Sequence, residues 1–386
     1  MKKIAILLIT LTWWMPQPGS VFAQSESTPM GDYAPEALCV PGIYSGDQNC
    51  LALGASETLK NLSETGMEYP LKGLPAYALD EDASKMPFRY AKLNVDPTKQ
   101  VNTFPSLDAA VANQGASGYI PPGATRYIAY TGTVDVNGGH YVELAESGEW
   151  VRASPSDYSR FRGLVFWRTP ENDFGWLVDV GRSRTGPGLE YPETGLSYPR
   201  DTLMQVYETA QANQTTWYRI GIHEWMERRV MRVVTVNTDA PEGVNGNRWI
   251  EVNLYEQTLS VYENGQLAYA ALVATGMDPF FTRPGLFQIR EKKETETMTG
   301  AFTADKSDYY YFEQVPWTMY FDGSRALHAA YWRTLFGYEA SHGCVNLAPA
   351  DAHWLFDWAA VGDWVYVWDP SGQTPTDPSL YTDGGA

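Results

Sequence analysis

The sequence predicts a mainly β protein, and three observations support this prediction. Aromatic residues make up 14% of the 386 residues, and their side chains fit the pleated, half-buried surface of a sheet. From residue 86 onward, short runs of alternating apolar residues are separated by turn signals. The last third of the chain contains a single strong helical pattern, at 349–360. We therefore expect two consecutive β regions, the second of which carries one helix.

The first 23 residues have the pattern of a secretory signal peptide. Two lysines precede an apolar run over residues 4–15, and small residues precede a cleavage site after Ala23. Pro16 and Pro18 end the run short of the roughly 20 apolar residues that span a bilayer, which argues against an uncleaved anchor. We expect an exported protein, in the periplasm or at the cell wall, with no membrane-spanning segment after cleavage.

The three cysteines fall into a close pair and a distant single residue. Cys39 and Cys50 are expected to form a disulfide, because an oxidising compartment favours pairing of neighbouring thiols. The bond would pin the region 24–85, which is rich in Pro, Gly, Ser and acidic residues and has one helix-like stretch. Cys344 is then left unpaired, and a free thiol in that compartment is exposed to oxidation.

The net charge restricts the partners. The chain carries 28 Lys and Arg against 46 Asp and Glu, a formal net charge of −18. This charge opposes binding to nucleic acid and to anionic membrane surfaces. We expect a monomer.

The segment 86–240 is expected to be all β. Asn137 and Gly138 lie between alternating runs and fit a type I′ hairpin turn, because both residue types tolerate positive φ. A hairpin followed by GEWVRA, with TTWYRI later in the segment, resembles bacterial SH3-like modules attached to wall enzymes. A β-sandwich platform of another kind is an equal alternative.

Turn residues accumulate at 237–247 and mark a boundary. The region that follows, 246–370, opens with alternating apolar positions and a turn at Asn264-Gly265, which predicts two hairpin arms. Aromatic and β-branched runs predict further strands at 283–290, 316–321, 325–329 and 363–369.

The helix expected at 349–360 has signals at both ends. Pro349 suits a first helical position, Asp351 complements the positive end of the helix dipole, and Gly362 stops the helix. Its apolar face would consist of Trp354, Leu355, Trp358 and Ala359. Residues 371–386 are expected to form a disordered tail.

Cys344 lies in EASHGCVNLAPAD, beside a glycine and a histidine. A thiol attacks as the thiolate, so it needs a base or a cation nearby. His342 lies two residues away, on the same face of an extended segment, and His328 ends a run from which a neighbouring strand can present its imidazole. Gly343 lets the backbone approach a substrate, and amides around it can donate to an oxyanion. These groups suffice for acyl transfer, and a buried inert cysteine is the alternative.

The stretch LHAAYWRTLFGYEASHGCVNL is similar to the motif of the L,D-transpeptidase family, whose catalytic domain is also called YkuD. The match covers His328 and residues 341–346. Upstream, residues 250–276 are similar to the opening strands of the family, and TRPGLF (282–287) to its Thr-Pro-x-Gly-x-Phe turn, with Pro284 displaced by one position. The resemblance covers 246–370 and implies a YkuD-type β-sandwich with one helix after the cysteine.

The resemblance also implies a role for each matched residue. Cys344 would be the nucleophile, and His328 the base that activates it and later protonates the leaving amine. The carbonyl of Ala329 would orient the imidazole. The remaining implied positions are an oxyanion site (His342, Gly343 and the Cys344 amide), support of the loop (Ser341 and Asn346) and a substrate groove (Trp317, Tyr320 and Trp332). For Trp317 and Tyr320, a place in the core is the alternative.

The implied reaction uses peptidoglycan stem peptides as donor and acceptor. The thiolate attacks the carbonyl of the third residue of a tetrapeptide stem, expels the terminal D-alanine and forms a thioester. The amine of a second stem then resolves the thioester and gives a 3→3 crosslink. Resolution by water or by a D-amino acid would make the protein an L,D-carboxypeptidase or an exchange enzyme. No cofactor and no metal are implied.

Three other classes of protein fit the sequence less well. A sortase needs an arginine after its cysteine, and the chain has no Arg or Lys from Val345 to Ala386. A papain-like or NlpC-type peptidase needs a histidine after the cysteine, and His353 is too close in sequence. A non-catalytic wall-binding protein would be expected to have lost the thiol or His328, and both are present.

Overall fold

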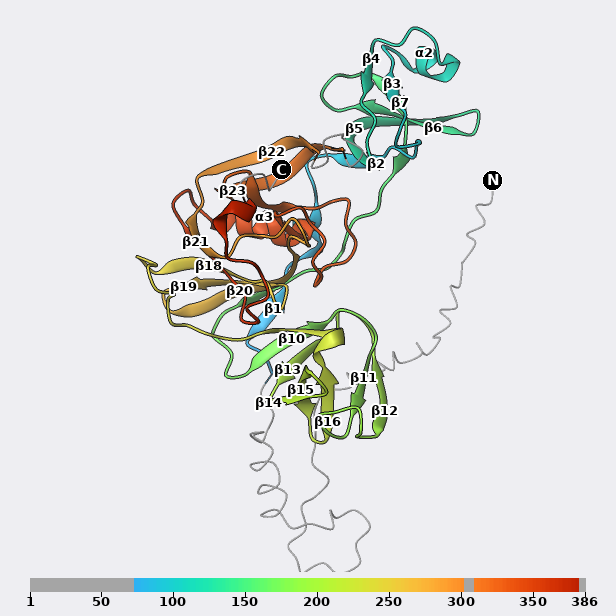
Figure 1. Cartoon of the computed structure of the whole chain (residues 1–386). Helices are drawn as coiled ribbons and strands as arrows, with labels where there is room; N and C mark the ends of the chain where they lie inside the picture. The colour runs from blue at the N-terminus through green and yellow to red at the C-terminus, as the bar shows by residue number, and fades with distance from the viewer. Residues whose placement is uncertain (1–72, 302–308, 382–386) are drawn as a thin grey trace, which may run out of the picture. The chain divides into compact units, whose positions relative to one another are not determined.

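The computed structural model describes residues 73–301 and 309–381. The expected signal peptide and the Cys39–Cys50 disulfide lie outside the described residues. Strands dominate the described chain, which contains two α-helices, α2 (Leu107–Ala112) and α3 (Pro349–Trp358). The prediction of a mainly β protein is therefore confirmed (Figure 1).

The first part of the described chain forms a β module around an apolar core of its own. Its longest hairpin turns at Asn137 and Gly138, whose φ angles of 51° and 72° are those of the predicted turn. The elements are β1 (Ala76–Ala78), the 3-10 helix η1 (Glu81–Ser84), β2 (Arg89–Lys92), β3 (Val101–Thr103), α2, β4 (Gly118–Ile120), β5 (Thr125–Val136), β6 (Gly139–Leu144), β7 (Trp150–Arg152) and β8 (Ser154–Pro155).

Helix α2 departs from the all-β expectation for 86–240. Ser106 caps its first turn by accepting a hydrogen bond from the Ala109 N–H, and Asn113 ends it in the left-handed conformation. Both are ordinary helix-boundary signals. The six-residue helix lacks the length that makes a periodic pattern visible.

The second part of the chain begins with β9, which pairs with β20 of the following region and with β1. Two small sheets follow, in the orders β13-β10-β17 and β12-β11-β16-β15-β14. The elements are β9 (Leu164–Phe166), β10 (Asp173–Leu177), β11 (Gly181–Arg184), β12 (Glu193–Tyr198), β13 (Leu203–Val206), β14 (Glu208–Ala212), β15 (Thr215–Gly221), β16 (Glu224–Glu227), η2 (Arg228–Val230) and β17 (Met231–Val234).

The third part contains the strands predicted between 246 and 370. They follow the order β21-β26-β18-β19-β20-β25-β24-β23, and the buried side chains of α3 pack into the same core. The elements are β18 (Arg248–Asn253), β19 (Thr258–Glu263), β20 (Gln266–Ala274), β21 (Gly285–Gln288), β22 (Glu291–Gly300), β23 (Tyr310–Asp322), β24 (Arg325–Ala329), β25 (Val345–Leu347), α3, β26 (Trp364–Trp368) and η3 (Pro378–Tyr381).

Two details differ from the expected helix and tail. Asp351 is fully buried in α3, where its Oδ1 accepts hydrogen bonds from the Tyr269 hydroxyl (2.6 Å) and the Gly163 N–H (2.7 Å). The tail, expected to be disordered, forms η3 and buries Tyr381, whose carbonyl lies 3.4 Å from the Arg325 guanidinium. Tertiary contacts therefore order this tail as far as residue 381.

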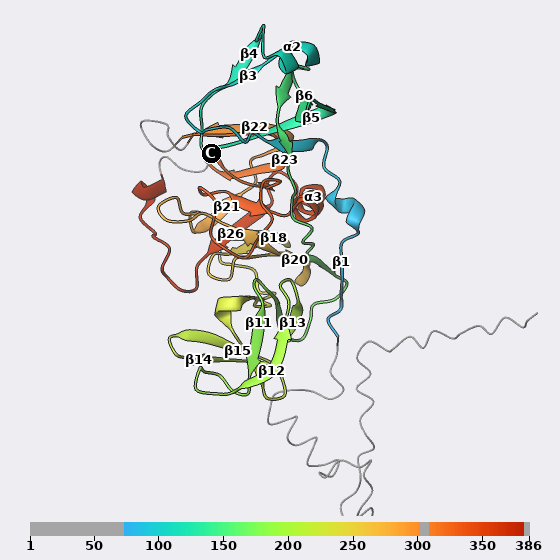
Figure 2. The same cartoon turned by 90° about the vertical axis from the view of Figure 1, so that its right-hand side faces the viewer.

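Strand pairing joins the upstream parts to the third part. β5 runs parallel to β23, with Thr125 opposite Tyr310 and Tyr127 opposite Phe312, and the two strands lie side by side in Figures 1 and 2. β9 pairs with β20 through Val165 and Leu164. The sheets that hold His328 and residues 341–346 are therefore completed by strands from outside the resemblance.

Candidate active site

The two halves of the histidine–cysteine motif come together on neighbouring parallel strands. β24 pairs with β25 so that His328 lies opposite Asn346. Successive residues of a strand point to opposite faces, so Cys344 and Asn346 share one face with His328. All three side chains are buried, with exposed fractions of 6%, 2% and 2%. The parallel register thus places thiol, amide and imidazole together.

His328 is held in one tautomer by its two neighbours. Its Nδ1 lies 3.0 Å from the carbonyl oxygen of Ala329, so Nδ1 carries the proton and donates it. Its Nε2 lies 3.1 Å from the Asn346 Nδ2 and therefore accepts. Burial lowers the pKa of His328 to about 4, with a smaller contribution from the nearby Arg333 and against the opposing effect of the Ala329 hydrogen bond, so the imidazole is neutral at pH 7.

The Cys344 sulfur is a thiol in this structure. Burial raises its pKa to about 11, although the Ala326 N–H, 3.4 Å from Sγ, favours the thiolate. The sulfur also lies 3.8 Å from the Ser324 carbonyl. Burial thus outweighs the influence of the Ala326 amide and of the Arg325 guanidinium, which both lower the pKa of the thiol.

The loop that carries the thiol is fixed by hydrogen bonds on both sides. The Ser341 hydroxyl donates to the Cys344 carbonyl and accepts from the Gly343 N–H. Gly343 has a φ of 115°, which other residues rarely adopt. Thr282 Oγ1 donates to the Gly343 carbonyl (2.8 Å) and accepts from the Gly276 N–H (2.9 Å). The Gly343 amide proton is thus committed to Ser341 rather than directed at a substrate.

A cavity of about 280 Å³ opens beside these groups. Aromatic rings form one wall: Trp332 stacks on Phe312 with centroids 3.9 Å apart, and Trp332 lies 5.6 Å from the His328 ring. The lining residues are Ala124, Thr125, Met298, Tyr310, Phe312, His328, Trp332, Arg333, Ala340, Ser341, His342, Cys344 and Asn346. The cavity therefore combines a thiol, an imidazole and an apolar wall.

The three residues predicted for a substrate groove occupy different places. Trp332 lines the cavity. Trp317 packs in the core and stacks on His353, with centroids 4.4 Å apart, and Tyr320 donates its hydroxyl to Glu296. Neither Trp317 nor Tyr320 lines this cavity, so their groove role stays a prediction.

Several site residues escaped the sequence analysis. Thr282 opens the TRPGLF stretch, and its position in that stretch was an available signal. Tyr310 and Phe312 line the cavity at the end of β23 that pairs with both β5 and β22, and the pairing with β5 joins segments far apart in the sequence. Arg333 lies in the segment between the two motif halves, where no local pattern identifies it.

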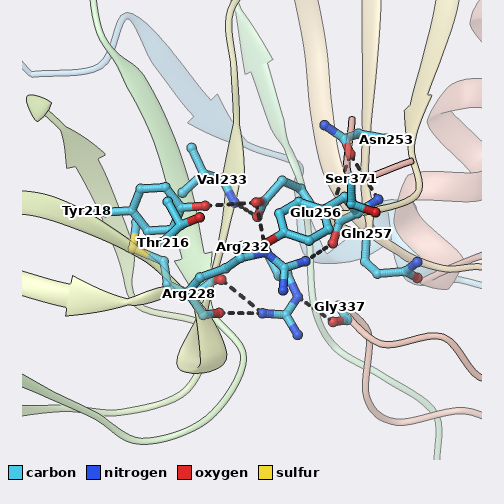
Figure 3. A network of polar contacts seen from close by, with 12 residues as sticks. Thr216, Tyr218, Arg228, Arg232, Val233, Asn253, Glu256, Gln257, Gly337 and Ser371 are labelled. Atoms are coloured by element: carbon cyan, nitrogen blue, oxygen red, sulfur yellow. Dashed lines mark hydrogen bonds and ion pairs between the residues drawn. The ribbon is translucent and has the colours of Figure 1, made fainter. Parts of the chain in front are cut away.

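The segment between the motif halves, 330–341, is held by the second part of the chain (Figure 3). Arg232 donates from Nε to the Gly337 carbonyl at 2.9 Å. The Tyr338 hydroxyl donates to the Val178 carbonyl at 2.7 Å. Arg232 and Val178 therefore fix the middle of the segment that also carries Trp332 and Arg333.

A buried carboxylate stabilises the neighbourhood of the contact between Arg232 and Gly337 (Figure 3). Glu256 accepts hydrogen bonds from the Tyr218 hydroxyl (2.8 Å) and the Val233 N–H (3.0 Å), and it pairs with Arg228 at 3.1 Å. Arg232 in turn donates to the Arg228 carbonyl at 2.6 Å. A buried charge is stable only when it is paired and hydrogen-bonded, and Glu256 meets both conditions.

Within 73–301 and 309–381, no group of three or more His, Cys, Asp or Glu side chains is arranged to hold a metal ion. Among the helices that the structure describes, none combines the length and the apolar content needed to cross a bilayer.

Comparison with known proteins finds relatives of the segment that holds Cys344 and His328. Residues 247–367 match the YkuD family, described as the L,D-transpeptidase catalytic domain. L,D-transpeptidase 1 of Mycobacterium tuberculosis is 29% identical over 167 residues, which cover 39% of this chain and 64% of the relative. The chain thus spans slightly less than two thirds of the curated relative that it matches.

Solved structures with related sequences include two L,D-transpeptidases. One from Stackebrandtia nassauensis is 29% identical, with 34% of this chain and 59% of that chain covered and a TM-score of 0.27. The catalytic domain of the Enterococcus faecium enzyme is 28% identical, with 33% of this chain and all of that domain covered and a TM-score of 0.29. The family match does not include residues 86–240, so the resemblance to SH3-like modules stays a prediction.

Proposed function

From the L,D-transpeptidase catalytic domain that residues 247–367 form, we propose that this protein is an exported enzyme that crosslinks peptidoglycan stem peptides through a Cys344 thioester. The observation that carries the proposal is the shared cavity: Cys344, His328 and Asn346 line it together with Trp332. A thiol, a neutral imidazole and an adjacent space for a peptide are the minimum for acyl transfer.

The first half-reaction begins from a neutral thiol and a neutral imidazole. His328 Nε2 holds the basic lone pair of the ring, because Nδ1 carries the proton that it donates to Ala329. It takes the thiol proton as Sγ attacks the carbonyl of the third stem residue. For this, Nε2 exchanges its contact with the Asn346 amide for a contact with the thiol. The carbon–nitrogen bond then breaks, and the proton passes to the departing amine of D-alanine.

The second half-reaction returns the site to its starting state. The amine of an acceptor stem attacks the thioester carbonyl and gives its proton to His328, which returns it to the sulfur. The product is a 3→3 crosslink. Water in place of the amine gives a carboxypeptidase, and a free D-amino acid gives exchange. The aromatic wall of Phe312 and Trp332, which is apolar and limits water, favours the amine.

The oxyanion of the tetrahedral intermediate needs donors near Cys344. The Gly343 amide is committed to Ser341, so we assign the oxyanion to the Cys344 amide together with the side chain of His342, which lines the cavity. The Ala326 N–H contributes at a different point, because it donates to Sγ and stabilises the thiolate as the sulfur loses its proton.

Mass spectrometry tests the proposal directly. The purified protein is incubated with a disaccharide that bears a tetrapeptide stem, beside its Cys344→Ala and His328→Ala variants. We expect loss of alanine and formation of a crosslinked dimer with the wild type only, and an acyl-enzyme mass on the wild type during turnover. Alanine release or dimer formation by Cys344→Ala would show that the mechanism is wrong. Monomeric product without dimer would select the carboxypeptidase.

Export is tested separately from chemistry. In its native host, the protein is expected outside the cytoplasm with a mature N-terminus after Ala23, a pattern that the first 23 residues predict. N-terminal sequencing of the exported form measures this. A non-catalytic wall-binding role is favoured if the exported protein sediments with isolated peptidoglycan and releases no alanine.

A further inference from the structure

The catalytic cavity contains one permanent charge. Arg333 is among its lining residues, and no Asp or Glu belongs to that lining within the described chain. This cation stands in a chain whose formal net charge is −18. A positive group is thus placed beside the thiol in a protein that is acidic elsewhere.

The hydrogen bonds of Arg333 leave much of its guanidinium available. Its Nε donates to the Asn346 Oδ1 at 3.1 Å, and Nη2 donates to the Ala340 carbonyl. A guanidinium has five N–H donors, so three are not used by these two contacts. Among the described residues, no carboxylate forms an ion pair with Arg333. Its charge interacts with the Tyr127 phenol and with the His328 imidazole.

Burial makes this arrangement costly without a ligand. It lowers the pKa of Arg333 to about 10, which still leaves the group charged at pH 7. A partly buried cation that lacks an anion is normally paired or removed. Its presence at the wall of a substrate cavity indicates that the substrate supplies the anion.

We propose that Arg333 binds a free carboxylate of the stem-peptide donor inside this cavity, so that the enzyme prefers anionic donors to amidated ones. The inference rests on the proposed transpeptidase function. A guanidinium presents parallel N–H donors that match the two oxygens of a carboxylate. The donor offers this chemistry at the terminal D-alanine and, where the third residue is a diamino diacid, on the side chain of that residue.

The bound carboxylate also changes the neighbouring base. The charge of Arg333 lowers the pKa of His328, and an anion on Arg333 offsets that charge. The imidazole therefore becomes a stronger base when the correct donor is present. Arg333 therefore couples the binding of the donor to the activation of His328. The same side chain also donates a hydrogen bond to the Oδ1 of Asn346.

The test compares three synthetic donors: one with both carboxylates free, one with a terminal carboxamide and one with a side-chain carboxamide at the third residue. Alanine or alaninamide release gives kcat/KM for the wild type, Arg333→Gln and Arg333→Lys. Arg229→Gln is the matched control, because its side chain is exposed and pairs only with Glu227. Circular dichroism and thermal unfolding check that each variant is folded.

We expect the wild type to prefer the free donor about tenfold to a hundredfold over one of the carboxamides, the range for a hydrogen bond to a charged group. The carboxamide that is discriminated against identifies which carboxylate Arg333 binds. Arg333→Gln should bring the ratio close to one, Arg333→Lys should retain part of it, and Arg229→Gln should leave it unchanged. A role in holding Asn346 alone would slow all donors equally and leave the ratio intact.

Two results overturn the proposal: a wild type that treats the three donors alike, which needs no variant, or an Arg333→Gln enzyme that keeps the wild-type preference. Calorimetry measures the binding of the same donors to Cys344→Ala, which cannot turn them over. This measurement separates a failure of the carboxylate site from a failure of the proposed transpeptidase function. Selectivity that depends on Arg333 in binding, without any turnover, supports the carboxylate site and contradicts the transpeptidase. Equal binding of all donors, together with turnover by the wild type, supports the transpeptidase and contradicts the carboxylate site.

Discussion

Asn346 stands between a cation and a base. Its Oδ1 accepts a hydrogen bond from Arg333, and its Nδ2 donates one to His328. Arg333 therefore fixes the orientation of the amide, and the amide in turn fixes the orientation of the imidazole. A neutral amide can serve both neighbours because it has one acceptor and one donor group. A carboxylate of the same size can accept the hydrogen bond from Arg333 but cannot donate one to His328. Replacing Asn346 by Asp therefore provides a test.

We predict that Asn346→Asp moves the acid limb of activity to higher pH. A carboxylate next to Nε2 favours the imidazolium and raises the pKa of His328 from its value of about 4, by about one to three units. Only the neutral imidazole accepts the thiol proton, so activity is lost as pH falls through the higher pKa. The measurement is kcat/KM for alanine release against pH, with Asn102→Asp at an exposed position as control. An unmoved acid limb would contradict the assigned base.

Thr282 ties the nucleophile loop to the preceding segment through two backbone groups. Thr282→Val keeps the side-chain shape but leaves the Gly276 N–H and the Gly343 carbonyl without their partner. We expect a loss of about 2 to 4 kcal/mol in the free energy of unfolding, with slower alanine release because Gly343 adjoins Cys344. Urea unfolding measures the first effect. Thr282→Ser keeps the hydroxyl and is the control; equal stability of the two variants would rule out the link.

At the scale of elements, the pairing of β5 with β23 helps to position Phe312 in the aromatic wall. The pairing of Thr125 with Tyr310 brings the first residues of β23 to the cavity. Close backbone approach makes this possible: a Cβ on Gly123 would lie 2.5 Å from the Tyr309 carbonyl oxygen. The absence of a side chain at Gly123 therefore permits contact between the upstream module and the catalytic strand.

We predict that Gly123→Ala lowers kcat/KM although it changes no residue of the cavity. The added methyl forces β5 away from β23, at a cost of about 1 to 3 kcal/mol in stability, and shifts Tyr310 and Phe312. Gly73→Ala is the matched control, since a Cβ there meets nothing within 4 Å. The variants are compared by thermal unfolding and by alanine release. A Gly123→Ala enzyme with wild-type kinetics would show that the pairing does not position the wall.

Local elements were predictable where local residues determine them. The two Asn-Gly turns have φ angles of 51° and 72° at 137–138, and 54° and 72° at 264–265, because only these residue types form a type I′ turn easily. Helix α3 begins at Pro349 as predicted. Arg333, Tyr310 and the clamp on Gly337 depend on contacts between segments far apart in sequence, and no local periodicity records such contacts.

The whole molecule buries several carboxyl groups whose protonation depends on folding. Burial raises the pKa of Glu251, Glu313 and Asp351 to about 7 each. Each group then binds a proton more tightly in the folded state than in the unfolded one. The stability of the protein therefore falls as pH rises from the unfolded pKa to the folded pKa of these groups.

We predict that Glu251→Gln stabilises the protein at pH 8 and has little effect at pH 4. The amide keeps an acceptor for the Trp368 Nε1–H, which lies 2.8 Å from Oε1, and it removes a charge that must otherwise be buried. The gain in the free energy of unfolding is at most about 3 kcal/mol, which corresponds to the difference between a pKa of 4.5 and one of about 7. Denaturant unfolding at both pH values measures it, with exposed Glu242→Gln as control. A gain of equal size at both pH values would contradict the raised pKa.

Tyr381 has a practical consequence for anyone who shortens this chain. Its carbonyl contacts the buried Arg325 guanidinium, and Ser324, next to Arg325, contacts the Cys344 sulfur through its own carbonyl. A recombinant protein cut at residue 367, where the family match ends, would lack this anchor of Arg325, whose charge favours the Cys344 thiolate. Screening of inhibitors against such a truncated protein would therefore probe a loosened pocket, and the longer chain is the appropriate target.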